Sequence, residues 1–266
     1  TRDRRQRQMC IRDSYYRGKL EGETEIQFVD RIVGNLENLI IAEDPSTIAA
    51  FIAEPITGAS GVIVPPDGYY EGIQNVLDKY GIMFWADEVI TGFGRTGSDF
   101  GCTTMEIKSP DMMTFAKQLS SAYMPISASA IRRDVYEAMI DQSASAGAFG
   151  HGYTYSGHPV ACAVALRVLE IYDRDEIFDR ASTTGKYLQE QLSQFSSHPL
   201  VGEVRGSGLL AALELVPNKE LNHQFKDGKV GGVAQKMAQD NGLLIRTVAG
   251  SSIGICPPLI LSLIHI

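Results

Sequence analysis

Lys117 comes directly after an apolar run, at the expected end of a strand, and its amine could take part in covalent chemistry. The run within Asp111–Ala116 is typical of a buried strand, and the lysine comes directly after it. A second apolar run, Gly81–Ala86, ends in Asp87. Because the sites of open α/β sheets lie at the carboxyl ends of the strands, we expect the amine and the carboxylate to meet at one edge. Such a pair is what pyridoxal 5′-phosphate (PLP) requires: a lysine for a Schiff base and a carboxylate for the pyridinium nitrogen.

The elements that position these two residues form a strand–helix–strand pattern. Thr47–Ala53 is a strand candidate, and Tyr69–Tyr80 has the apolar spacing of a helix. The strands that end at Asp87 and Lys117 follow, and then a further β run, Pro125–Ile131. This order predicts an α/β fold in which the sheet is mostly parallel.

The second half of the chain predicts two long helices and then a small α+β domain. The helices run over Val160–Phe178 and Ala181–Phe195, and Ser196–Pro199 resembles a boundary. Beyond it we expect strands over Val204–Val216, Leu243–Arg246 and Ile253–Cys256, with a helix near Gly232–Asn241. We therefore divide the chain into a large domain, residues 15–195, and a small C-terminal domain, residues 196–260.

Composition limits the classes of function. The chain has 266 residues and a net charge of −8, without a basic face, which argues against nucleic acid and anionic membranes as partners. No apolar run approaches the roughly 20 residues of a membrane-spanning helix. The four cysteines are far apart and form no CxxC or His/Cys cluster, so we expect no metal site. Scattered thiols of this kind fit a reducing, cytoplasmic location best.

Both ends differ in character from the rest of the sequence. Thr1–Ser14 is strongly basic without periodicity, and Leu261–Ile266 stops without a polar tail. Both strings resemble translated adapter sequence, so we expect them to be non-native and exclude them from the fold argument. The alternative is a basic surface arm and a last strand.

Two short motifs resemble nucleotide sites but lack the required context. Gly92–Gly97 satisfies GxGxxG, yet no helical period follows it, as a dinucleotide site would need. Asp99–Gly101 spells a kinase metal motif only two residues later, which leaves no room for the intervening kinase elements. We expect the glycines to let the backbone pass close to a ligand or a neighbouring subunit.

Several longer motifs resemble those of class III (ω-) aminotransferases, which are PLP enzymes of fold type I. They are FWADEVITGFGRTG at Phe84–Gly97, the lysine motif at Pro110–Gln118, GHGYTYSGHP at Gly150–Pro159, and GLLIR at Gly242–Arg246 with Pro257–Leu259. The resemblance runs from about Gly34 to Ile260. It implies part of the large PLP-binding domain followed by part of the small one. We find neither the family's small-residue phosphate loop nor its cofactor-stacking aromatic residue. We therefore expect this chain to be a fragment of a longer protein, called the full-length protein below.

The resemblance assigns roles at the two strand ends. Lys117 would form the Schiff base with the cofactor and move a proton between substrate and cofactor. Asp87 would keep the ring nitrogen protonated, since charge pairing favours that state. Val89, two residues on, would point the same way as Asp87 and pack on the ring. Many family members have Gln after this Val, whereas Ile90 cannot hydrogen-bond to the cofactor.

Three further residues complete the predicted site. Thr154 would bind the cofactor phosphate from across a homodimer interface. Glu54 would shape the site from the end of its strand. Arg246 is the candidate for the substrate carboxylate, because a guanidinium can grip a carboxylate with two hydrogen bonds.

The function that the resemblance implies is PLP-dependent transamination. An amino group would pass from an amine or ω-amino acid donor to a keto-acid acceptor such as pyruvate. A PLP aminomutase or decarboxylase of the same fold is an alternative that these residues separate poorly. The third alternative is a non-enzymatic fragment that keeps the sheet but does not retain the cofactor.

Overall fold

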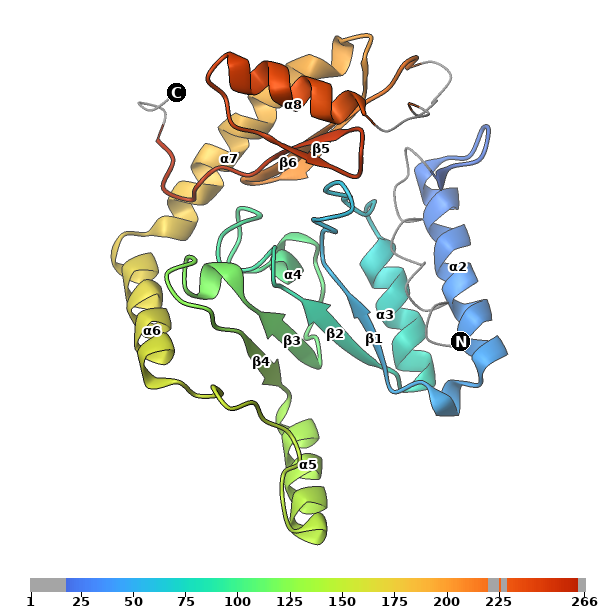
Figure 1. The fold of residues 1–266 in the computed structure, drawn as a ribbon. Helices are drawn as coiled ribbons and strands as arrows, with labels where there is room; N and C mark the ends of the chain where they lie inside the picture. Colours follow the sequence, from blue (N-terminus) through green and yellow to red (C-terminus); the bar gives the residue numbers. More distant parts are fainter. Residues whose placement is uncertain (1–17, 220–224, 226–228, 263–266) are drawn as a thin grey trace.

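A mostly parallel sheet in the first half of the chain brings Glu54, Asp87 and Lys117 of the predicted site to its strand ends. The computed structural model describes residues 18–219, 225 and 229–262, and within them this sheet has the order β1-β2-β3-β4. Its strands are β1 (Ala50–Ala53), β2 (Met83–Asp87), β3 (Met112–Phe115) and β4 (Ala128–Ile131). The first three are parallel, and β4 is antiparallel to β3. The predicted α/β fold with a mostly parallel sheet is therefore confirmed (Figure 1).

Helices α2 (Glu25–Glu43) and α3 (Tyr69–Tyr80) lie side by side next to this sheet (Figure 1). The bounds predicted for α3 are confirmed. It begins after Gly68 and ends at Gly81, and both glycines have left-handed backbone angles that L side chains rarely adopt. Helix α2 begins with a capping box between Thr24 and Gln27. The two helices and the sheet bury a first apolar cluster, which includes Phe28, Ile32, Leu36, Tyr70, Ile73, Leu77 and Phe84.

Three short helical turns lie before β1 and between the later strands of this sheet, and three longer helices follow β4. A 3₁₀ turn, η3 (Pro45–Thr47), precedes β1; the one-turn helix α4 (Gly101–Thr104) follows the glycine-rich motif; and η4 (Lys117–Leu119) follows β3. The longer helices are α5 (Arg133–Ala146), α6 (Pro159–Arg174) and α7 (Ile177–Ser193). The predicted helix over Val160–Phe178 is too long, because Glu176 takes a left-handed backbone conformation, φ 50°, that separates α6 from α7.

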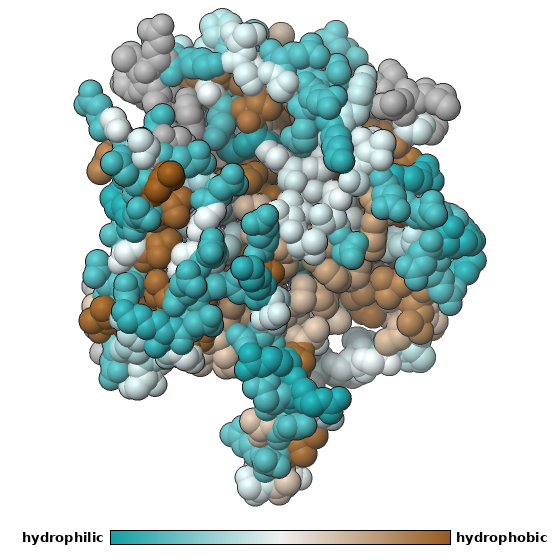
Figure 2. Space-filling view, turned by 180° about the vertical axis from the view of Figure 1, so that it is seen from behind, coloured by the Kyte–Doolittle hydropathy of each residue, from teal (hydrophilic) through white to brown (hydrophobic). Residues whose placement is uncertain are grey.

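Helix α5 differs from its neighbours in its surroundings. None of its residues is buried, and it projects from the body of the molecule (Figures 1 and 2). Helices α6 and α7 instead bury a second apolar cluster, which includes Phe93, Leu119, Ala165, Val168, Tyr172, Ile177, Ala181 and Leu209.

The second sheet is antiparallel and has the order β5-β6-β8-β7. After the 3₁₀ turn η5 (Gln194–Ser197), its strands are β5 (Val201–Ser207), β6 (Leu210–Leu215), β7 (Arg246–Val248) and β8 (Ser252–Ile255), with helix α8 (Val230–Asp240) between β6 and β7. The predicted strand Leu243–Arg246 is wrong. Strand β7 begins only at Arg246, because Leu243 and Leu244 follow the turn at the end of α8 with exposed side chains. The division at residues 195 and 196 stays a prediction.

The glycine-rich motif Gly92–Gly97 packs against the small domain of the same chain. A Cβ added to Gly208 would lie 2.3 Å from the Gly97 amide nitrogen. The buried Arg95 donates to the carbonyl oxygens of Leu209 at 3.0 Å and Pro257 at 2.6 Å. Gly97 of this motif therefore approaches the backbone of the β5–β6 turn, and the expectation that the motif also passes close to a ligand or a neighbouring subunit stays a prediction.

No helix in the part of the chain that the structure describes is long and apolar enough to cross a membrane. The predicted non-native segment Thr1–Ser14 lies outside the described residues, as do residues 263–266 of the other end.

Candidate active site

Three ionisable residues lie at the carboxyl ends of strands β1, β2 and β3 in the mostly parallel sheet. Asp87 is the last residue of β2 and pairs in register with Thr114 of β3. Lys117 comes two residues after the end of β3, and Glu54 comes directly after β1. Because these three strands are parallel neighbours, their carboxyl ends meet at one edge. The structure thus brings together the amine and the carboxylate that the sequence predicts there.

Glu54 is within electrostatic reach of both other groups. Burial raises the pKa of its carboxyl, and the negative charge of Asp87 raises it further. The hydrogen bond from the Gly58 amide, 2.9 Å from Oε2, and the positive charge of Lys117 both lower it. A second hydrogen bond, from the Tyr70 hydroxyl to the Glu54 carbonyl oxygen at 2.7 Å, fixes the backbone at this strand end. Glu54 is therefore held as part of the same charged group as Asp87 and Lys117.

Asp87 keeps one carboxylate oxygen open. Its Oδ1 accepts a hydrogen bond from the Val89 amide at 3.0 Å. No other described residue donates to this half-buried carboxylate. The remaining oxygen is thus available to a ligand that carries a proton.

The alternation of side-chain directions along β2 does not extend to Val89, although the prediction that Val89 points the same way as Asp87 requires it to. The strand ends at Asp87, and Val89 lies in the turn that follows, so side-chain direction at this position is set by the turn. Val89 is half-buried and belongs to none of the apolar clusters among the described residues. Its role against a cofactor ring stays a prediction.

Ile90 packs against the loop after β1 and against residues of the small domain. A Cβ added to Gly58 would lie 2.5 Å from Ile90 Cδ1. Ile90 packs on the third apolar cluster, which consists of Ile56, Val62, Leu210 and Ala212. It therefore joins the loop after β1 to the small domain.

Lys117 is exposed and sits in an uncommon backbone conformation. Its φ is 44°, in the left-handed region that residues other than glycine usually avoid. No hydrogen bond or ion pair to its amine occurs among the residues that the structure describes. Non-glycine residues with such strain often lie at functional sites, where the surrounding structure holds them in place.

Glu88 is a buried carboxylate to which the sequence argument gave no role. Its side chain is fully buried. It accepts hydrogen bonds from the Thr91 hydroxyl at 2.5 Å, the Gly101 amide at 2.9 Å and the Cys102 amide at 2.7 Å. The pKa of the Cys102 thiol is raised, first by burial and then by the charge of Glu88. Glu88 thus ties α4 to the end of β2, and the acid placed directly beyond an apolar run was the signal for it in the sequence.

The other two predicted residues lie apart from this edge. Thr154 is exposed in the loop between α5 and α6, and Arg246 is exposed at the first position of β7, where it pairs with Gly254. Within the described residues, no hydrogen bond or ion pair joins either residue to Asp87 or Lys117. Their roles stay predictions, and that of Thr154 requires a second subunit.

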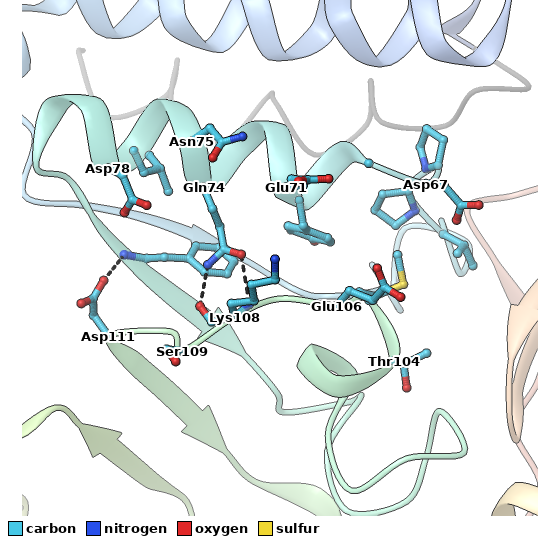
Figure 3. Close-up of a pocket in the computed structure, with 18 of the residues that line it drawn as sticks. Asp67, Glu71, Gln74, Asn75, Asp78, Thr104, Glu106, Lys108, Ser109 and Asp111 are labelled. Carbon is cyan, nitrogen blue, oxygen red and sulfur yellow. Dashed lines mark hydrogen bonds between the residues drawn. The ribbon is translucent and has the colours of Figure 1, made fainter.

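A groove of about 720 Å³ lies elsewhere, between α3 and the segment from Thr104 to Asp111 (Figure 3). Its lining includes the carboxylates Asp67, Glu71, Asp78, Glu106 and Asp111. Gln74 bridges it through hydrogen bonds with both backbone groups of Lys108. Among the described residues, no group of three or more His, Cys, Asp or Glu side chains is placed to hold a metal ion. The groove contains none of the residues predicted for the site.

Comparison with known families gives one match over almost the whole chain. The model of the family described as "Aminotransferase class-III" matches residues 11–266. Among curated proteins, the chain is similar to probable gamma-aminobutyrate transaminase 3, mitochondrial, of Oryza sativa subsp. indica, at 49% identity over 93% of this chain and 48% of that protein. It is also similar to gamma aminobutyrate transaminase 3, chloroplastic, of Solanum lycopersicum, at 48% identity over 94% of this chain and 48% of that protein. The chain thus spans about half the length of these curated relatives.

Solved structures give the same result for the fold. The omega transaminase from Pseudomonas jessenii in complex with PMP superposes with a TM-score of 0.91 at 49% identity, over 94% of this chain and 55% of that chain. A transaminase with L-ala superposes with a TM-score of 0.91 at 46% identity, over 94% of this chain and 59% of that chain.

Proposed function

The chain belongs to the class-III aminotransferase family, and we propose that the full-length protein is a PLP-dependent aminotransferase. It would move an amino group from an amine or ω-amino acid to a keto acid such as pyruvate. The observation that carries the proposal is the meeting of Asp87 and Lys117 at adjacent strand ends, with Glu54 beside them.

The residues at this edge fit PLP. The open oxygen of Asp87 can accept a hydrogen bond from the N–H of a pyridinium ring, and the unpartnered Lys117 amine can bond to an aldehyde carbon. When bound, PLP supplies an electron sink that lets a proton leave the substrate carbon next to the amino group. Thr154, from a second subunit, would hold the phosphate.

The chain's own residues then have distinct tasks. The negative charge of Asp87 favours the protonated ring nitrogen at neutral pH. Lys117 would accept a proton at Nζ from the substrate carbon and pass it to the cofactor, so its place relative to Asp87 matters. Arg246 recognises the carboxylate of a keto acid or ω-amino acid. Val89 packs against the ring.

The substrate class follows from the relatives as a proposal. The named relatives include gamma-aminobutyrate transaminases and an omega transaminase, which supports an amine or ω-amino acid donor. An aminomutase or decarboxylase of the same fold would use the same Asp87 and Lys117. Alanine formed from pyruvate and an amine distinguishes transfer from both alternatives.

A homodimer is the proposed assembly, because Thr154 lies away from the Lys117 edge of its own chain. The aromatic residues Tyr153 and Tyr155 beside it are 77% and 80% exposed, which supports a partner on this surface. Mixed dimers of Lys117→Ala and Thr154→Ala subunits test the arrangement in the full-length protein. Trans donation predicts one site with both lesions and one with neither, and hence recovered activity. No recovery, with mixed dimers shown to form, counts against it.

We propose the cytoplasm as the compartment. The described cysteines Cys102, Cys162 and Cys256 are free thiols, which supports a reducing location. Fractionation of the source cells checks this, and recovery in an organelle would contradict it.

Covalent labelling tests the assignment of Lys117. We expect visible absorbance after PLP is added, its loss on borohydride reduction, and a pyridoxyl group on Lys117 in the peptide map. Lys117→Ala should remove the label and the transamination of the full-length protein. Lys186→Ala, at an exposed position of α7, is the matched control and should change neither. Label on another lysine would overturn the assignment, and absence of label would favour a fragment that does not retain the cofactor.

A further inference from the structure

Tyr172 reaches from helix α6 to the turn that carries Lys117. Its side chain belongs to the second apolar cluster and is only 6% exposed. The ring packs against that of Phe178, with centroids 5.4 Å apart. Its hydroxyl lies 2.8 Å from the carbonyl oxygen of Gln118 and 2.8 Å from Ser121 Oγ. A polar group of α6 is thus placed against the residue next to the lysine.

The turn that receives these hydrogen bonds is strained at three positions. Lys117, Ser121 and Ala122 have φ values of 44°, 47° and 64°. None is a glycine, and L side chains make this left-handed region unfavourable. Such a turn persists only where other contacts hold it.

Most of the turn's hydrogen bonds are internal. The Ser121 amide donates to the Gln118 carbonyl oxygen at 3.2 Å, and the Ser120 hydroxyl donates to the Met124 carbonyl oxygen at 2.6 Å. Among the residues that the structure describes, Tyr172 alone hydrogen-bonds to the segment Ala116–Met124 from outside it. Burial raises the pKa of the Tyr172 hydroxyl, so it keeps the proton that it donates.

We propose that Tyr172 is a positioning residue for Lys117. Its hydroxyl holds the strained turn Lys117–Ala122 in place and thereby sets where the Lys117 amine lies relative to Asp87. This role deepens the proposed function and rests on it.

Tyr172→Phe tests the role, because phenylalanine keeps the ring contact with Phe178 and removes only the hydroxyl. Tyr187→Phe, at an exposed position of α7, is the matched control. Amide hydrogen exchange of the chain, measured without cofactor, should become roughly five- to tenfold faster over residues 118–123 in Tyr172→Phe, as loss of the buried hydroxyl's hydrogen bonds to Gln118 and Ser121 predicts. Exchange within α6 and α7 should not change, and the control should match the unmodified chain. Unchanged exchange over residues 118–123, or equal acceleration throughout α6 and α7, would overturn the proposal.

A second measurement reports on the amine itself. The fraction of Lys117 that becomes pyridoxylated is measured against PLP concentration after borohydride reduction. The half-saturating PLP concentration should rise about fivefold in Tyr172→Phe and stay the same in Tyr187→Phe, while labelling of Lys186 should be equal in all three. An unchanged midpoint would overturn the positioning of the amine. Absence of label from Lys117 in the unmodified full-length protein would overturn the proposed function instead, and the exchange rates then decide alone whether Tyr172 holds the turn.

Discussion

Arg205 of β5 and Gly61 connect the antiparallel sheet to the loop after β1: the guanidinium Nε of Arg205 lies 2.9 Å from the Gly61 carbonyl oxygen and donates to it. The same nitrogen donates to the Val62 carbonyl oxygen at 3.0 Å. Arg205 also pairs with Glu214, and the two side chains are only 8% and 6% exposed. The loop held in this way supplies the Gly58 amide that binds Glu54. The small domain therefore supports the edge of the mostly parallel sheet where Glu54, Asp87 and Lys117 lie.

Arg205→Met should destabilise the chain substantially, because it removes the cation from a buried carboxylate. Breaking a buried ion pair on one side costs about 3–5 kcal/mol. The free energy of unfolding in urea measures the loss. Arg167→Ala is the control, since its pair with Glu170 is exposed on both sides, and exposed pairs contribute about 0–1 kcal/mol. The double variant Arg205→Met/Glu214→Gln should recover part of the stability, and a further loss would contradict this explanation.

Glu88→Gln should also lower stability. The carboxylate accepts from three donors, whereas an amide has one oxygen and brings its own N–H groups against donors. Loss of charge-assisted buried hydrogen bonds predicts a cost of about 2–3 kcal/mol. Urea unfolding measures it, with the exposed Glu106→Gln as control. A neutral effect would contradict the stabilising role of these three hydrogen bonds.

The raised pKa of Glu54 predicts how stability changes with pH. Burial, and then Asp87, raise this pKa above its ordinary value of 4.5, so the folded chain holds the proton to higher pH than the unfolded chain. The stabilisation from this group is fully present below the unfolded pKa and is lost as the pH rises through the folded pKa. Glu54→Gln removes the titration, so its stability relative to the unmodified chain should increase as the pH rises from 4 towards neutral.

Urea unfolding across this pH range measures the difference between the two proteins. Glu71→Gln, at an exposed position of α3, controls for the loss of a surface carboxylate. A difference that stays constant with pH would show that the pKa of Glu54 is not raised.

The strands before Asp87 and Lys117 and the helix Tyr69–Tyr80 could be predicted from sequence, because their signals lie within short stretches of the chain. The apolar runs before Asp87 and Lys117 mark strands, and parallel strands bring their carboxyl ends together without knowledge of any side-chain contact. The helix Tyr69–Tyr80 was predictable because its apolar spacing is regular and a glycine ends it. The spacing of Phe28, Ile32, Leu36 and Ile40 carries the same signal for α2.

The remaining features depend on contacts between segments far apart in the chain. Periodicity along the sequence does not show that Gly97 meets Gly208, or that Arg95 and Arg205 are buried cations between the two halves. The hydrogen bond from Tyr172 to Gln118 is of the same kind, since the sequence marks Tyr172 only as an apolar position. Leu243 and Leu244 show the opposite error: an apolar run predicted a strand where the sheet does not yet begin.

Arg246→Ala should weaken the reaction with carboxylate substrates more than that with simple amines. Its guanidinium is exposed at the start of β7 and has no ion-pair partner among the described residues, so it is available to a ligand. Loss of a charge-assisted pair should cost about 1.5–3 kcal/mol for the keto acid. Single-turnover rates of the full-length protein, with amine and with pyruvate separately, measure the two halves. Equal losses in both would make Arg246 structural, and Arg167→Ala should leave both rates unchanged.

Asp87→Asn should reduce turnover far more than cofactor binding. The amide keeps the shape of the side chain and can still accept from the Val89 amide, but it carries no charge to hold a proton on the ring nitrogen. Loss of one preorganised electrostatic interaction typically lowers kcat by roughly 100- to 1,000-fold. The full-length protein is assayed for kcat with an amine and pyruvate, and for its PLP dissociation constant, with the exposed Asp99→Asn as control. Near-normal turnover in Asp87→Asn would refute the electrostatic role, whereas a large loss of PLP binding with normal turnover at saturation would make Asp87 a binding residue alone.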